Sequence, residues 1–187
     1  MGALKMALVI NGTSIPSSGK VVCNGTSLKQ LNIGGTKVWN SGIDLIAANN
    51  WTKTSSQDGF WGSSTSQLWL RAQWRTDWWN WIIVRSAALN LTGYTQITLQ
   101  WDNDGVSGPN WKGFGGFSTN ASLTQKEQFS TNMTEVLDTQ IHGASGTKTF
   151  SIPSQFRKNG VYFYAERHFY MANGKNEYLR FYKIQIS

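Results

Sequence analysis

Hydrophobic and polar residues alternate along residues 68–75, in the part of the chain richest in tryptophan. Leu68 and Leu70 fall on one side of the alternation, and Trp69 and Arg71 fall on the other. A period of two places successive side chains on opposite faces of a β-strand. Residues 78–84 are rich in aromatic and β-branched residues, which is typical of a second strand, and residues 76–77 can form a turn between them. We therefore predict a hairpin over residues 68–84, with one face in a core and the other carrying aromatic side chains.

The same alternation recurs in residues 96–101, 160–170 and 177–186, and residues 148–152 also read as a strand. Residues 172–176 contain Asn-Gly, a turn dipeptide, and predict a hairpin between the last two strands. Residues 49–66 are polar without alternation, so we expect a loop there, with Phe60 and Trp61 anchoring it against the rim of a sheet. About seven to nine strands with long loops predict an all-β fold, an antiparallel jelly-roll β-sandwich.

The first forty residues follow a different pattern. Short β-branched runs are closed by Asn11-Gly12, Asn24-Gly25 and Gly34-Gly35, which supply the positive φ angles of tight hairpin turns. The segment has too few apolar side chains to form a core by itself. We predict that residues 1–40 form a small β-hairpin or β-meander attachment module, and that residues 43–187 form the jelly-roll domain.

Composition and charge argue against nucleic-acid binding, membrane insertion and a disulfide within the chain. Charged residues make up 14% of the 187 residues, against about 25% in an average soluble protein. The net charge is +7, but the basic residues are spread along the chain, whereas a nucleic-acid groove concentrates them on one face. We therefore expect no nucleic-acid partner. No apolar stretch reaches 18 residues, so we expect no membrane insertion. The single cysteine, Cys23, excludes a disulfide within the chain.

We expect no enzymatic activity. The 10 acidic residues show no spacing that favours a catalytic pair. The chain also lacks a Gly-x-Ser-x-Gly elbow, a phosphate-binding loop and a His-Glu-x-x-His motif.

Asp102 and Asp104 are candidate ligands of a structural calcium ion, and we expect no other cofactor. The run Asp-Asn-Asp-Gly over residues 102–105 is similar to the start of a calcium-binding loop. The glutamate that an EF-hand needs at its twelfth position is replaced by Gly113. A simple turn between strands is the alternative.

Exposed aromatic rings beside amide side chains favour sugar recognition. The candidate glycan platform consists of Trp78, Trp79, Asn80, Trp81 and Trp111. The same rings also suit a hydrophobic core or a protein interface, because tryptophan buries a large area in both. The sequence leaves these three alternatives open.

Two segments show a resemblance to a known family. Residues 89–99, beginning Leu-Asn-Leu-Thr-Gly-Tyr-Thr, and residues 178–186 resemble strands of galactose-binding-like jelly rolls in bacteriophage and prophage virion proteins of Firmicutes. The Asn-Gly-Thr repeats before Val38-Trp39 look like the short N-terminal modules of phage tail, fibre or decoration proteins. The resemblance implies a virion component with carbohydrate binding as an option, and it implies no defined site residues.

These observations predict a non-enzymatic structural protein of a phage particle, a tail, fibre or capsid decoration protein. Its N-terminal module would attach to the particle and its jelly-roll domain would be displayed. The expected partners are other virion proteins and further copies of the chain, with a trimer as one option. The alternative is a carbohydrate-binding module or adhesin that recognises host-surface glycans. The apolar run over residues 6–10 is too short for the hydrophobic region of a signal peptide, so we expect assembly in the host cytoplasm and location in the virion.

Overall fold

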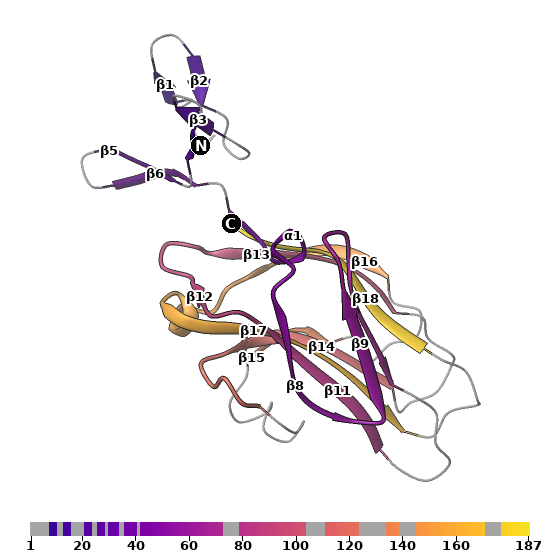
Figure 1. Cartoon of the computed structure of the whole chain (residues 1–187). Coiled ribbons are helices and arrows are strands. Elements are labelled where there is room, and N and C mark those ends of the chain that lie inside the picture. The colour runs from indigo at the N-terminus through magenta and orange to yellow at the C-terminus, as the bar shows by residue number, and fades with distance from the viewer. Residues whose placement is uncertain are drawn as a thin grey trace, which may run out of the picture. The chain divides into compact units, whose positions relative to one another are not determined.

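The computed structural model shown in Figure 1 describes residues 8–10, 13–15, 21–23, 26–28, 30–33, 36–40, 42–72, 79–103, 111–123, 134–138, 145–170 and 177–187. The chain divides into two compact units. The first comprises Met1–Ile43 with Ser187, and the second comprises Asp44–Ile186. No helix in the described ranges is long and apolar enough to cross a membrane.

In its described residues, the first unit contains three two-stranded antiparallel sheets, and the predicted attachment module stays a prediction. Their strands flank the three predicted turn dipeptides, which themselves lie outside the described residues. The pairs are β1 (Leu8–Ile10) with β2 (Thr13–Ile15), β3 (Val21–Cys23) with β4 (Thr26–Leu28), and β5 (Gln30–Ile33) with β6 (Thr36–Asn40).

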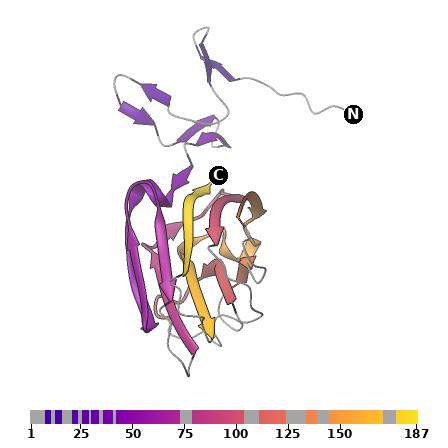
Figure 2. The ribbon, with the colours of Figure 1, turned by 90° about the vertical axis from the view of Figure 1, so that its right-hand side faces the viewer.

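The second unit is a sandwich of two antiparallel sheets (Figures 1 and 2). What we call the β18 sheet contains, in spatial order, β16 (Gly146–Ser151), β13 (Gln96–Asn103), β18 (Glu177–Ile186), β10 (Leu68–Ala72) and β9 (Gly59–Ser63). Figure 2 views this sheet with the yellow β18 near its centre. The β17 sheet contains β15 (Thr134–Asp138), β14 (Trp111–Ser118), β17 (Asn159–Tyr170), β11 (Trp79–Ser86) and β8 (Trp51–Gln57).

Short elements complete the unit. They are β7 (Ile43–Asp44), the helix α1 (Leu45–Ala48), β12 (Leu89–Asn90), which pairs with β17, and a 3₁₀ turn at Ser154–Phe156. Helix α1 begins at Asp44, whose carboxylate accepts hydrogen bonds from the backbone N–H groups of Ile46 and Ala47, both at 3.0 Å. This is an N-cap, which satisfies amides that have no partner within the helix.

The strand order is that of a jelly roll. The pairs β10–β18, β11–β17, β13–β16 and β14–β15 are the rungs of one long antiparallel ribbon. The ribbon is rolled up so that β18 also pairs with β13 and β17 also pairs with β14. Eight strands wound in this way form the two sheets of a jelly roll. The predicted fold class, an all-β antiparallel jelly-roll sandwich, is therefore confirmed.

Both predicted hairpins in this unit are wrong. Strand β10 pairs with β18 and β9, whereas β11 pairs with β17 and β8 in the other sheet. Likewise β17 and β18 lie in opposite sheets. Rolling the ribbon sends β10 and β11 to different sheets, and likewise β17 and β18, so the connections predicted as hairpin turns cross between the two layers. A turn dipeptide between two strand patterns does not reveal this, because it reports only the local reversal of the chain.

The loop predicted for residues 49–66 is also wrong, because this segment contains β8 and β9. The chain passes from the β17 sheet to the β18 sheet at Asp58, which has a left-handed φ of 49°. A Cβ atom at Gly59 would lie 2.4 Å from the carbonyl oxygen of Trp81, so a side chain there would collide with β11. A glycine at this corner lets the backbones of the two layers approach each other closely.

The hydrophobic core lies between the two sheets and confirms the alternation seen in the sequence. Leu68 and Leu70 are fully buried, whereas Trp69 and Arg71 between and after them are only partly buried. From the β17 sheet, Phe117 and Phe163 pack edge to face with ring centroids 5.5 Å apart. The remaining fully buried side chains of the two inner faces include Ile97, Leu99, Val161, Leu179, Phe181, Ile184 and Ile186.

Candidate functional site

Three aromatic side chains and two arginines lie together on the outer face of the β18 sheet. They are Phe60, Trp69, Arg71, Tyr178 and Arg180, and within β10 and β18 they alternate with the buried residues Leu68, Leu70, Leu179 and Phe181. We call these five residues the arginine–aromatic cluster. They come from β9, β10 and β18, so the cluster exists only because the jelly roll places β18 beside β10.

One row of the cluster crosses three strands. The register pairs Phe60 with Arg71 and Arg71 with Tyr178. The guanidinium carbon of Arg71 lies 4.6 Å from the centre of the Phe60 ring and 6.0 Å from the centre of the Tyr178 ring. Both distances are within the range of cation–π interactions. Phe60 at the end of this row is 44% exposed, and Arg71 and Tyr178 are half-buried.

The next row places Trp69 beside Gly62 and Arg180. A Cβ atom added at Gly62 would lie 2.6–2.8 Å from three atoms of the Trp69 indole, so the indole packs directly against this glycine. Trp69 is half-buried. Tyr178 meets Trp69 edge to face, with centroids 5.7 Å apart, and Arg180 lies 4.5 Å from the centre of the Tyr178 ring.

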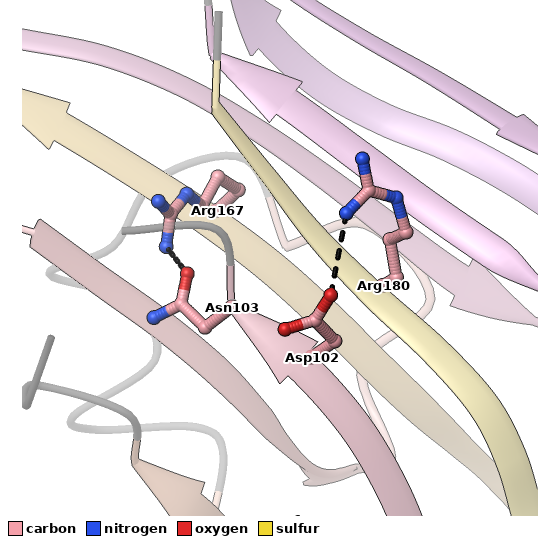
Figure 3. Close-up of polar contacts among 4 residues, drawn as sticks. All are labelled: Asp102, Asn103, Arg167 and Arg180. Atoms are coloured by element: carbon pink, nitrogen blue, oxygen red, sulfur yellow. Dashed lines mark hydrogen bonds and ion pairs between the residues drawn. The ribbon is translucent and has the colours of Figure 1, made fainter. Parts of the chain in front are cut away.

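Asp102 on β13 extends this second row. Its Oδ2 accepts a hydrogen bond from Nη1 of Arg180 at 3.4 Å, and the two side chains are 36% and 24% exposed. Figure 3 shows that the neighbouring Asn103 turns to the other side of the strand, where its side-chain oxygen accepts a hydrogen bond from the fully buried Arg167 of β17. Asp102 therefore belongs to the outer face and Asn103 to the interior, as the period of a strand requires.

Polar side chains continue the outer face toward the β16 edge. The hydroxyls of Thr98 and Thr149 are hydrogen-bonded at 2.8 Å. Thr98 on β13 is paired in register with Thr149 on one side and with Gln185 on the other. Gln100 and Lys183 are paired in register and exposed. The face thus combines rings, two guanidinium groups, a carboxylate, amides and hydroxyls, which can stack on a ligand and form hydrogen bonds to it.

The outer face of the β17 sheet is different because residues 119–123 cover part of it. Leu123 packs with Ile83 and Tyr164 in a cluster of fully buried side chains. The Tyr164 hydroxyl donates a hydrogen bond to the carbonyl oxygen of Asn120 at 2.6 Å, and Arg85 Nε donates to the carbonyl oxygen of Ala121 at 2.9 Å. Burial is the main cause that raises the pKa of Tyr164.

The structure describes only one side chain of the tryptophan platform predicted from the sequence. Trp81 is half-buried, packs against the cluster of Ile83, Leu123 and Tyr164, and donates from its indole nitrogen to the Ser55 hydroxyl at 3.1 Å. Trp78 lies outside the described residues, and the side chains of Trp79, Asn80 and Trp111 do too, although their backbones belong to β11 and β14. That platform stays a prediction.

The calcium site also stays a prediction. Asp102 is bound to Arg180 as described above, and Asp104 lies outside the described residues. Within the described ranges, no group of three or more His, Cys, Asp and Glu side chains has the arrangement of a metal site.

The sequence does not point to Phe60, Trp69 and Tyr178 as a site. Phe60 falls in the segment for which the sequence predicts a loop, and Tyr178 is more than a hundred residues away from both other rings. The available signal was the alternation itself, which places Trp69 with Arg71 and Tyr178 with Arg180 on one face of each strand. Nothing in the sequence shows that these two faces are the same face of one sheet.

Comparison with known proteins gives distant structural matches alone. No protein-family model matches the chain, and no curated protein sequence matches it. Among solved structures, the K3 cleaved adhesin domain of Lys-gingipain from Porphyromonas gingivalis W83 is similar over 78% of this chain and 96% of its own, at 12% identity and a TM-score of 0.48.

Two carbohydrate-binding modules are also similar. Family 29 module CBM29_1 from Piromyces equi matches over 73% of this chain and 80% of its own, at 12% identity and a TM-score of 0.40. CBM27-1 from Caldicellulosiruptor saccharolyticus, solved in complex with mannohexaose, matches over 78% and 96%, at 10% identity and a TM-score of 0.39. These three structures give no link to a phage particle, so the virion assignment stays a prediction. The jelly-roll assignment rests on the strand pairings.

Proposed function

We propose that the jelly-roll unit is a carbohydrate-binding module without catalytic activity and that the arginine–aromatic cluster is its glycan platform. One observation carries the proposal: the rings of Phe60, Trp69 and Tyr178 gather on an open sheet face beside guanidinium, carboxylate, amide and hydroxyl groups. Sugar sites combine aromatic rings with a few polar groups that fix the orientation of the ligand.

The position of Trp69 supports a stacked sugar. Its indole packs against Gly62 on the outer face of the β18 sheet and is only half-buried. The apolar C–H face of a pyranose can lie on such a ring while its hydroxyls reach Asp102 and Arg180, which are paired in the same row. Tyr178 contacts both Trp69 and Arg180 and so holds the platform together.

A large protein partner fits this face less well. A stable protein interface buries about 800 Å² on each partner around an apolar centre. Among the described residues, the exposed large hydrophobic side chains are Phe60 at 44% and Tyr182 at 42%. Two partly exposed rings among charged and amide side chains suit a narrow ligand such as a sugar chain better than the broad surface of a protein.

The test is a glycan-array measurement with two tryptophan variants. We expect Trp69→Ala to weaken glycan binding about tenfold or more, with a small change in melting temperature, because Trp69 stands outside the core. Trp81→Ala is the matched control on the other sheet. Loss of binding in a folded Trp81→Ala protein, with Trp69→Ala still binding, would move the site to the tryptophans predicted from the sequence.

We further propose that residues 1–40 attach the jelly-roll unit to a larger assembly, in line with the virion location expected from the sequence. Each described hairpin of this segment has two strands, and a two-stranded hairpin by itself is marginal in water. Partners that complete these sheets would stabilise them. Failure of a protein lacking residues 1–40 to enter phage particles would support the proposal, and normal incorporation would contradict it.

A further inference from the structure

The two arginines of the cluster differ in their charge balance. Arg180 has the carboxylate of Asp102 at 3.4 Å, so its charge is compensated within the protein. Arg71 has the rings of Phe60 and Tyr178 as its neighbours. Its Nε is buried without a hydrogen-bond partner in the described part of the chain, and no carboxylate there pairs with it. Among the described residues, Arg71 therefore holds a partly desolvated positive charge that no carboxylate compensates.

The packing of Arg71 orients this charge for a ligand. The guanidinium group lies between two rings in one row across β9, β10 and β18, which restricts the rotation of a side chain that is otherwise highly flexible. A planar guanidinium forms paired hydrogen bonds with a carboxylate or phosphate, and these are stronger than bonds between neutral groups. Loss of side-chain freedom on binding is smaller when the group is already held in place.

The distance between the charge and the platform fits one monosaccharide unit with an acidic substituent. Arg71 and Trp69 are two residues apart on the same face of β10, and Tyr178 touches both. Adjacent same-face positions on a strand are about 7 Å apart. A sugar ring stacked on Trp69 or Tyr178 would thus bring a carboxylate or phosphate on that ring, or on its neighbour in the polymer, to the guanidinium of Arg71.

We propose that the platform selects acidic glycans, meaning polysaccharides with a carboxylate or phosphate on the sugar chain, and that Arg71 binds the anionic group. This inference rests on the proposed glycan-binding function and adds the substrate class. The net charge of +7 acts in the same direction, because it attracts polyanions at long range, but it does not choose among them. Discrimination between acidic and neutral sugars is the property assigned to Arg71.

The experiment compares acidic glycans with their neutral counterparts on the full-length protein. Polygalacturonate, alginate and hyaluronate are each immobilised in the native form and in the carboxyl-reduced form, and poly(glycerol phosphate) is added as a phosphate polymer. We expect binding to at least one acidic polymer about tenfold tighter than to its reduced form in 0.15 M salt. Tightest binding to poly(glycerol phosphate) would identify phosphate, rather than carboxylate, as the anionic group.

Three variants separate the role of Arg71 from total charge. Arg71→Met keeps an unbranched side chain between the rings and should remove the preference for acidic polymers. Arg71→Lys keeps the charge without the planar fork and should retain part of the preference. Lys53→Met removes the same unit of charge from an exposed position on β8 and should leave the preference unchanged.

The outcomes distinguish this inference from the proposed function. Equal binding of native and reduced polymers, lost in Trp69→Ala, would overturn acidic selectivity and leave the glycan-binding function standing. A preference that survives in a folded Arg71→Met protein would overturn the role of Arg71. Binding to no polymer, acidic or neutral, would overturn both. The comparison of native and reduced polymers uses the wild-type protein, so it decides the selectivity even if the Arg71 variants fail to fold.

Discussion

The outer faces of the two sheets both carry aromatic residues and arginine, but they differ in how far the described chain covers these side chains. On the β17 sheet, residues 119–123 fold back over Ile83 and Tyr164, so the aromatic ring there is buried by the chain itself. On the β18 sheet, Trp69 and Tyr178 form a comparable aromatic pair, and Phe60 beside them is 44% exposed. Among the described residues, the chain thus covers the aromatic ring on one outer face and leaves Phe60 exposed on the other.

Arginine plays opposite roles on the two faces. Arg85 stacks on Tyr162 with 4.7 Å between its guanidinium carbon and the ring centre, and it also donates a hydrogen bond to the covering segment at Ala121. Arg71 makes the same kind of ring contact on the β18 sheet, and its Nε donates no hydrogen bond among the described residues. Arg85 thus helps to hold the covering segment on the β17 sheet, whereas Arg71 is the arginine that we propose for binding a ligand.

The largest expected effect is on stability, from truncation on the covered face. Leu123→Ala removes a fully buried side chain that packs on Ile83 and Tyr164, and we expect it to lower the free energy of unfolding by about 2–5 kcal/mol. Tyr182→Ala on the other sheet, where the ring is 42% exposed, should cost about 0.5 kcal/mol or less. Urea denaturation of both variants measures the difference, and similar costs would show that the two faces are not distinct.

A smaller and pH-dependent effect is expected at the hydroxyl of Tyr164. Burial raises the pKa of this group above its ordinary value of 10.0, so the folded protein holds the proton more tightly than the unfolded chain. Its contribution to stability is therefore present below about pH 10 and is lost as the pH rises through the folded-state pKa.

Tyr164→Phe should remove this alkaline loss. It should also cost about 1–3 kcal/mol at pH 7, because the carbonyl of Asn120 loses its 2.6 Å hydrogen bond. Denaturation curves of wild type and variant between pH 7 and pH 11 provide the test. The difference between their free energies of unfolding should shrink at high pH; a constant difference would contradict the assigned role.

On the open face, Gly62→Ala should change binding more than stability. The new Cβ would meet the Trp69 indole at 2.6 Å and tilt the ring that we assign to sugar stacking. We expect glycan affinity to fall about fivefold and the free energy of unfolding to fall by about 1 kcal/mol. In a Trp69→Ala background, Gly62→Ala should have no further effect on affinity, because the two changes act through the same ring. Additive losses would mean that Gly62 acts independently of Trp69.

The smallest expected effect on the jelly-roll unit comes from removing residues 1–40. The unit of Asp44–Ile186 has its own core, so its melting temperature should stay within about 2 °C of that of the full chain. Light scattering of both forms measures the mass in solution. An oligomer that dissociates on truncation would make residues 1–40 an assembly element, whereas a monomer in both forms would favour a self-contained binding module.

The sequence by itself determined which residues face the core within each strand. The period of two along residues 68–71, 96–99 and 178–181 separates buried Leu68, Ile97 and Leu179 from their outward neighbours, and the structure agrees. Burial of alternate side chains is a local consequence of strand geometry, so it is encoded within each segment. The all-β class and the jelly-roll type follow from the number and spacing of such segments.

Only the tertiary structure decided which strands are neighbours. The strands on either side of the turns predicted at residues 76–77 and 172–176 lie in opposite sheets, because partners in a jelly roll are selected by the packing of the whole ribbon rather than by the nearest turn. β9 was missed for a related reason: its glycine-rich sequence has little strand character alone, and its place is fixed by pairing with β10. The cluster of Phe60, Trp69, Arg71, Tyr178 and Arg180 needs this pairing. The alternation within each strand determines which side chains face outward. The long-range pairing of β9, β10 and β18 brings those side chains together on one face of the sheet.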